Sequence, residues 1–143
     1  MNRLVIHSPA DGSLVGEIPI TPVEAIEGVV QQAHAAYLEW REVPLRERAE
    51  AMRRLRRLIA HERHRIAELV AREQGKPAIE AMIVELFPPI DMATYLIYEG
   101  VRLLAPRRVR SRNPFMADRH CTYYFHPYGV WAVIAPWNYP FTL

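Results

Sequence analysis

The sequence has few residues that could form cross-links or bind metals. Its 143 residues contain one cysteine, Cys121, so no disulfide can form within the chain, which fits a reducing compartment. The six histidines include one helical pair, His61 and His64, but no further ligand pattern completes a metal site. No base is spaced to activate Cys121, which favours a structural cysteine over a nucleophile.

The glycines are too scattered to form a nucleotide-binding loop. The dinucleotide fingerprint Gly-x-Gly-x-x-Gly is absent from the sequence. The Gly75-Lys76 pair is not a phosphate loop, because Val70 and Pro77 stand where that loop needs glycine and a hydroxyl residue. Gly75 instead predicts the end of a helix.

Long hydrophobic runs and a strong net charge are lacking as well. Only three apolar residues, 4–6, precede the first turn, too few for a secretory signal, and no run approaches a membrane span. The formal net charge is +2, and glutamates accompany the arginines around 53–65, which favours a solvated helix face over nucleic-acid binding. The expectation is a cytoplasmic protein without a membrane or nucleic-acid partner.

Periodicity and turn residues predict a hairpin followed by helices. Asp11-Gly12 is a strong hairpin signal, and apolar residues then recur at helical spacing. Pro88 and Pro89 are expected to kink or break the last helix. The predicted strands cover 3–6 and 14–20, and the predicted helices cover 22–40, 45–74 and 78–104.

The last third of the sequence predicts strands. The segment 105–115, rich in arginine and proline, is expected to be an exposed crossing segment. A half-exposed strand near 119–126 follows, and then a strand over 130–135 that is apolar on both faces, as in a buried parallel sheet. Helices followed by a buried strand predict an α/β protein of which only the opening is present.

One polar side chain, Asn138, follows the predicted buried strand. α/β proteins place ligands beyond the carboxyl ends of parallel strands, and an asparagine amide can donate hydrogen bonds to a developing oxyanion. The alternative is an asparagine that caps a turn between Pro136 and Pro140. These residues alone favour the turn cap.

The region around Asn138 resembles the aldehyde dehydrogenase superfamily. "HPYGVWAVIAPWNYPF" is similar to that family's P-x-G-V-x-x-x-I-x-P-W-N-x-P segment, and the opening hairpin, the first two helices and "REQGKPAIEA" agree in order and spacing. The resemblance covers essentially the whole chain but only the N-terminal portion of a family member. It implies an α/β, aldehyde dehydrogenase-like fold, whose hairpin and helices lead into the first strands of an incomplete Rossmann-like cofactor-binding sheet.

The resemblance implies site residues near the end of the sequence. Asn138 would donate its amide to the oxygen of a cysteine thiohemiacetal during NAD(P)-dependent oxidation of an aldehyde to a carboxylic acid. The NAD or NADP site would be lined, largely through backbone, by Ile134, Ala135, Pro136 and Trp137.

The resemblance also implies how the chain is organised. Residues 1–143 would be the N-terminal, incomplete part of the cofactor-binding domain, with an oligomerisation-arm strand region at 106–128. Gly75 and Lys76 would be structural. The family's catalytic cysteine and general-base glutamate lie C-terminal to the matched region, and Cys121 does not fit the nucleophile's motif.

The resemblance predicts that residues 1–143 are inactive alone. The chain would be a truncated gene product, a split-gene subunit or a fragment. Its expected partners are an aldehyde substrate and either identical copies or a C-terminal complementing chain. The alternative is a non-catalytic association module that pairs with such a chain or with a full-length dehydrogenase.

Overall fold

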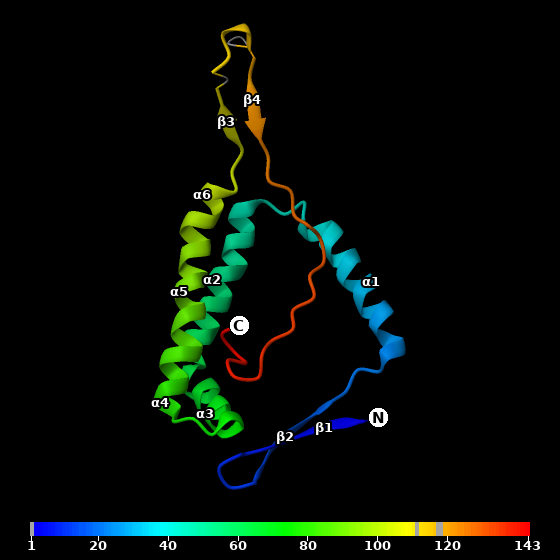
Figure 1. Ribbon diagram of the computed structural model, residues 1–143, viewed down its shortest axis with the longest axis vertical. Helices are drawn as coiled ribbons and strands as arrows, with labels where there is room; N and C mark the ends of the chain where they lie inside the picture. The colour runs from blue at the N-terminus through cyan, green and yellow to red at the C-terminus, as the bar shows by residue number, and fades with distance from the viewer. Residues whose placement is uncertain (1, 111, 117–118) are drawn as a thin grey trace.

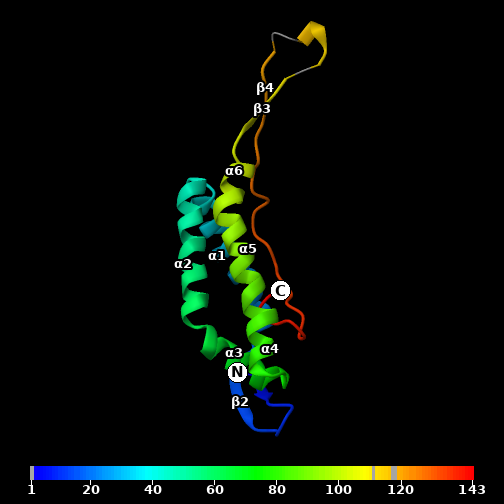
Figure 2. The same cartoon turned by 90° about the vertical axis from the view of Figure 1, so that its left-hand side faces the viewer.

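Two long antiparallel helical rods form the centre of an elongated molecule (Figure 1). The structure is a computed structural model, which describes residues 2–110, 112–116 and 119–143. One rod is α2, and the other, which we call the apolar rod, runs from Ala78 to Leu103. The helix α1 stands apart from this pair (Figure 1), and α3 lies at one end of it (Figures 1 and 2). The α-helices are α1 (Val23–Trp40), α2 (Leu45–His61), α3 (Arg63–Gln74), α4 (Ala78–Ala81), α5 (Phe87–Tyr95) and α6 (Val101–Leu103), with π-helical segments η1 (Met82–Leu86) and η2 (Leu96–Gly100) in the apolar rod.

The prolines predicted to kink or break the third helix are accommodated without a break. The π-helical segment η1 precedes them, and the backbone N–H of Phe87 bonds to the carbonyl of Met82, five residues earlier. Pro88 and Pro89 then lie in the first turn of α5, where a missing N–H costs least. The wider π-helical turn therefore lets the helix continue through both prolines.

The apolar rod is long and apolar enough to span a membrane by length and composition, although no uninterrupted apolar run in the sequence predicted this. A core helix meets the same criterion. This one packs against α2, and its η1 segment packs against α3. It also buries the charged side chain of Glu85. These contacts favour a helix packed inside a protein.

The N-terminal hairpin forms as predicted. The strands β1 (Arg3–His7) and β2 (Leu14–Pro19) pair antiparallel, and Gly12 adopts a φ of 72° in the turn. The Asp11 carboxylate accepts hydrogen bonds from the Ser13 hydroxyl at 2.8 Å and from the Ser13 backbone N–H at 3.1 Å. These bonds close the turn.

The hydrogen bonds from Ser13 lower the pKa of the Asp11 carboxyl below its usual 3.8. Because the folded pKa is depressed, this stabilisation is present above the unfolded pKa and is lost as the pH falls through the folded value. An NMR titration is expected to show a lower pKa for Asp11 in the folded protein than in an unfolded peptide. Ser13→Ala should raise that pKa, and an unchanged value in this variant would contradict the assignment.

A small core lies where α2, α3 and the apolar rod meet. Phe141, from the C-terminal segment, packs against it, so this segment is attached to the same end of the helices. Burial of these apolar side chains is the main force that holds the elements together. The core consists of Ile59, Ala67, Val70, Ala81 and Leu86.

The end of α3 depends on a glycine, as predicted. Gly75 has a φ of 70°, and a Cβ at this position would lie 3.0 Å from Cγ of Pro9 in the hairpin turn. Gly75→Ala is expected to lower the free energy of unfolding by about 1–2 kcal/mol, because alanine disfavours the left-handed conformation. The matched control is Gly28→Ala in α1, where the added Cβ has no atom within 4 Å other than the backbone of its own helix and its chain neighbours. For Gly28→Ala we expect the free energy of unfolding, measured with denaturant, to rise by about 0.5–1 kcal/mol. Equal effects at the two glycines would contradict this account.

The segment 105–115, expected to be a crossing segment, contains a short strand. β3 (Arg107–Val109) pairs antiparallel with β4 (Cys121–Tyr123), which lies inside the strand region predicted near 119–126. This hairpin projects beyond α6, away from the rest of the molecule (Figure 1). Both strands are exposed. The role of 106–128 as an oligomerisation arm stays a prediction.

The prediction of a buried strand over 130–135 is wrong for this structure. The segment is irregular and belongs to neither two-stranded sheet, and Ile134 is 95% exposed. A parallel strand needs a neighbouring strand to accept and donate its ladder hydrogen bonds. The described residues place no strand beside 130–135.

Candidate functional site

The predicted cofactor-lining residues lie on the irregular segment that leads to Asn138. Ile134 and Trp137 are strongly exposed, at 95% and 87%, and Ala135 is exposed too, whereas Pro136 is half-buried. The structure therefore brings these residues together on one accessible stretch. Their contact with NAD or NADP stays a prediction.

Asn138 is exposed in a turn that covers 137–142. Within the part of the chain that the structure describes, its side-chain amide makes no hydrogen bond, and only its backbone carbonyl is bonded. A turn-capping asparagine would use its side chain to bond nearby backbone groups. The structure thus gives no support to the turn-cap alternative and leaves the amide available to a ligand.

A buried ion pair holds one side of the Asn138 turn. The Lys76 Nζ lies 2.8 Å from Oε1 of Glu85, whose side chain is fully buried. The same ammonium donates a hydrogen bond to the backbone carbonyl of Asn138 at 3.2 Å. It also lies 5.0 Å from the centre of the Tyr139 ring, in a cation–π contact.

The second oxygen of Glu85 holds the other side of the turn. Its Oε2 accepts hydrogen bonds from the backbone N–H groups of Phe141 at 3.2 Å and Thr142 at 3.1 Å. Hydrogen bonds to an ionised acceptor are stronger than neutral ones. The Glu85 carboxylate therefore joins two parts of the turn. One oxygen bonds the ammonium that holds the Asn138 carbonyl, and the other bonds the backbone of Phe141 and Thr142.

Local structure explains how both anchors reach the turn. Gly75 ends α3 in the left-handed conformation and turns the chain, which places Lys76 between α3 and α4. Glu85 lies in η1, on the apolar rod beside the core residue Leu86. The two charged groups therefore meet next to the turn, because the end of α3 lies beside the η1 segment of the apolar rod.

The role of Glu85 was not predicted from the sequence, and Lys76 was expected to be only structural. Two signals point to them. Lys76 is the only lysine among cations that are otherwise arginines, and Glu85 is the only charged residue in the apolar stretch 81–90. A carboxylate in such a stretch is buried only when a partner compensates its charge.

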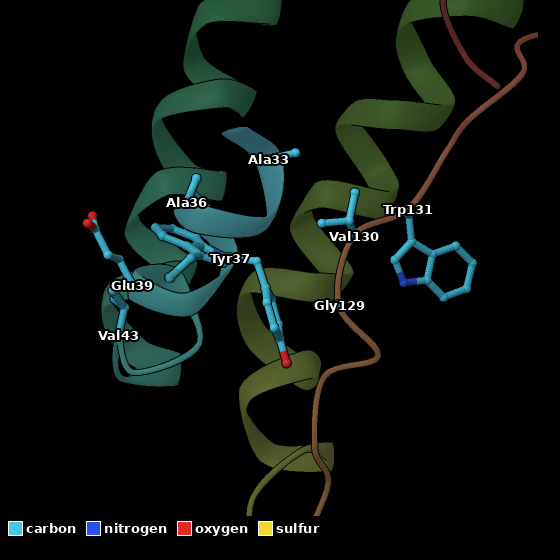
Figure 3. Close-up of a pocket in the computed structure, with 9 residues that line it drawn as sticks. Ala33, Ala36, Tyr37, Glu39, Val43, Gly129, Val130 and Trp131 are labelled. Carbon is cyan, nitrogen blue, oxygen red and sulfur yellow. The ribbon is translucent and has the colours of Figure 1, made fainter. Parts of the chain in front are cut away.

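An open pocket of about 630 Å³ lies beside the same segment but does not include Asn138. Figure 3 shows Ala33 and Tyr37 of α1 on the side of Gly129 and Val130, with Trp131 directed away from them. The lining is mostly apolar. Nothing in this pocket combines a nucleophile with a base.

The described residues place neither a metal centre nor a cysteine nucleophile beside the turn. In the described ranges, no group of three or more histidine, cysteine or acidic side chains could hold a metal ion. Cys121 is exposed on β4 of the projecting hairpin, so it does not contribute to a packed core as a structural cysteine would.

Comparison with known sequences identifies relatives along the whole chain. A profile of the Aldehyde dehydrogenase family matches residues 2–143. The chain is 34% identical to 4,4'-diapolycopene aldehyde oxidase of Methylomonas sp, over 100% of this chain and 27% of that protein. It is 31% identical to N-succinylglutamate 5-semialdehyde dehydrogenase 1 of Caulobacter vibrioides, over 99% of this chain and 29% of that protein. The chain thus spans less than a third of the length of these curated relatives.

Comparison with solved structures agrees. NADP-dependent glyceraldehyde-3-phosphate dehydrogenase of Bacillus halodurans C-125, solved in complex with NADP, superposes with a TM-score of 0.71 at 26% identity, over 78% of this chain and 23% of that one. This likeness confirms the predicted α/β, aldehyde dehydrogenase-like fold class, although the segment 130–135 is unpaired. The chain belongs to the aldehyde dehydrogenase family.

Proposed function

We propose that this chain supplies the oxyanion-binding asparagine of an NAD(P)-dependent aldehyde dehydrogenase, which oxidises an aldehyde to a carboxylic acid. The observation that carries the proposal is the exposed amide of Asn138, which bonds no described residue, on a turn fixed by Lys76 and Glu85. These contacts fix the backbone from which the amide extends, and a donor whose position is restricted before the reaction stabilises charge at a lower cost of reorganisation. The aldehyde-oxidising names of the relatives support the same reaction class.

The amide of Asn138 has a definite chemical task in this reaction. Attack of a cysteine thiolate on the aldehyde carbon makes that carbon tetrahedral and places negative charge on the carbonyl oxygen. The amide N–H would donate to this oxygen at about 2.7–3.1 Å. Because the amide is neutral, it stabilises the oxyanion without giving up a proton.

The segment 134–137 fits the predicted nicotinamide cofactor in one respect. Its backbone forms no ladder and the side chains of Ile134, Ala135 and Trp137 are exposed, so both are accessible to a ligand. NAD or NADP, when bound, supplies a hydride acceptor. The named NADP dependence of the Bacillus halodurans relative supports this cofactor class.

The thiolate is not expected to come from Cys121, which lies on the exposed hairpin. We propose that residues outside 1–143, in the same gene product or in another chain, provide it. The assay is NADH or NADPH formation from aliphatic aldehydes, aromatic aldehydes and semialdehydes by the complete gene product. We expect oxidation of at least one of them, and failure with every aldehyde would contradict the proposed function.

A polypeptide limited to residues 1–143 provides a further test. We expect it to form no NADH or NADPH from the same aldehydes, because Cys121 does not match the nucleophile's motif. Cys121→Ser in the complete gene product should leave kcat unchanged. Turnover by the short polypeptide, or loss of activity in Cys121→Ser, would contradict the assignment.

A second candidate function is association through the β3–β4 hairpin. The hairpin projects from the molecule and exposes Phe115 and Tyr123, together with the short edges of its two strands. Exposed aromatic residues and strand edges favour contact with another protein chain. Light scattering of the complete gene product is expected to show an oligomer that Tyr123→Asp weakens, and a monomeric wild type would contradict this role.

A further inference from the structure

We propose that Lys76 and Glu85 are positioning residues for Asn138, so that a buried ion pair in the helical core sets the geometry of the oxyanion donor. This inference rests on the proposed function. Neither residue is proposed to touch the substrate. Each acts through the backbone of the turn 137–142.

The ion pair bonds the backbone of the turn 137–142 at two places, one before Tyr139 and one after it. The Lys76 ammonium bonds the carbonyl of Asn138 itself, and the Glu85 carboxylate bonds the N–H groups of Phe141 and Thr142. Because the carbonyl of Asn138 is bonded, the position of its Cα is restricted, and so is the direction in which its side chain extends. Within the described residues, the side-chain amide of Asn138 makes no hydrogen bond, so it is available to a ligand.

Burial makes the arrangement rigid. Glu85 is fully buried and the side chain of Lys76 is 13% exposed, so water competes little for either charge. Both carboxylate oxygens are occupied, one by the ammonium and the other by two backbone N–H groups. Rotation of the carboxylate would leave three partly buried donors, on Lys76, Phe141 and Thr142, without this partner, which disfavours other orientations.

The ion pair also joins distant parts of the sequence. Glu85 lies 56 residues before Phe141, and Lys76 lies 62 residues before Asn138. Phe141 packs on the core that includes Leu86, the neighbour of Glu85. The adjacent residues Glu85 and Leu86 of η1 therefore connect the turn to the hydrophobic core.

A positioning role and a purely structural role predict different kinetics. If the pair only stabilised the fold, enzyme that remains folded would keep its wild-type kcat. If the pair positions Asn138, its loss lowers kcat with little change in KM for the aldehyde, because the oxyanion exists only after attack. The loss should also depend on the presence of the Asn138 amide.

The experiment uses the complete gene product with an aldehyde that it oxidises. Glu85→Gln, which removes the charge but keeps an acceptor oxygen, is expected to lower kcat roughly 10- to 100-fold. The control is Glu99→Gln, which breaks an exposed pair with Arg102 of 2.7 Å and should leave kcat unchanged. If Glu85→Gln does not fold, the uncharged double variant Lys76→Met/Glu85→Gln replaces it, since it leaves no unpaired buried charge.

A double-mutant cycle with Asn138→Ala decides the outcome. We expect Glu85→Gln to add little to the loss of kcat once the Asn138 amide is absent. A full additional loss in the Asn138→Ala background, or a wild-type kcat in folded Glu85→Gln enzyme, would overturn the positioning role. If Asn138→Ala itself has a wild-type kcat, the proposed function fails instead.

Hydrogen exchange tests the anchoring without catalysis. The backbone amides of Phe141 and Thr142 are expected to exchange faster in Glu85→Gln than in the wild type, and Glu99→Gln should leave them unchanged. Wild-type exchange at both amides in Glu85→Gln would overturn the proposed anchoring, whatever the kinetics show.

Discussion

Asn138→Ala is expected to lower kcat for aldehyde oxidation by about 10²–10³-fold in the complete gene product, the usual effect of removing one oxyanion donor. KM for NAD⁺ or NADP⁺ should stay close to wild type, because the amide bonds an oxygen that becomes charged only during the reaction. The side chain has no hydrogen bond within the described residues, so its removal should not disturb the turn. Steady-state kinetics, with thermal unfolding of the same samples, measures both effects.

Two further variants make this test specific. Asn138→Asp keeps the size of the side chain but places a carboxylate near the oxyanion, so a loss at least as large is expected. Asn2→Ala removes another exposed asparagine, close to β1, and should leave kcat unchanged. A kcat for Asn138→Ala within about twofold of wild type would contradict the oxyanion role, since twofold is well below the effect of losing such a donor.

Lys76→Met is expected to lower the free energy of unfolding by about 3–5 kcal/mol, the usual cost of leaving a buried charge without its partner. The variant leaves the fully buried Glu85 carboxylate without its ammonium. Methionine keeps most of the apolar length of lysine, so the change isolates the charge from the packing. Denaturant unfolding at neutral pH measures the loss.

The matched control is Arg102→Met in the exposed pair with Glu99, whose side chains are 72% and 43% exposed. Exposed pairs contribute about 0–1 kcal/mol, so we expect little change there. The double variant Lys76→Met/Glu85→Gln should regain much of the lost stability, because no charge then stays buried. A loss in Lys76→Met no larger than in Arg102→Met would contradict the account of the buried pair.

Features that depend on neighbouring residues were predictable from the sequence. The hairpin around Asp11-Gly12 and the end of α3 at Gly75 follow from backbone conformations that glycine favours. The helices follow from apolar spacing. The break at Glu62, which divides the predicted helix 45–74 into α2 and α3, has no proline or glycine to mark it and was missed.

Features that depend on distant residues were not predictable in the same way. The apolar stretch 130–135 has the composition of a buried strand, but a strand exists only when a neighbour pairs with it. β3 formed in a segment rich in arginine and proline because β4 pairs with it across the hairpin. The π-helical turns have no distinct residue pattern, although they explain how Pro88 and Pro89 fit in a helix.

The same distinction between neighbouring and distant residues applies to the candidate site. The motif around Asn138 predicted an oxyanion donor, and the structure adds that its amide bonds none of the described residues. The contacts of Glu85 with Phe141 and Thr142 join residues 56 and 57 positions apart, which no local pattern reveals. Sequence reasoning thus found the group proposed to act on the substrate and missed the pair that holds it.

The most direct test of the central claim is a crystal structure of the complete gene product with a trapped aldehyde adduct. The decisive measurement is the distance between the Asn138 amide nitrogen and the oxygen of the adduct. Our account predicts about 2.7–3.1 Å, with the Lys76 ammonium still bonded to the Asn138 carbonyl. An adduct oxygen bound only by other donors, with the amide of Asn138 beyond hydrogen-bonding distance, would contradict it.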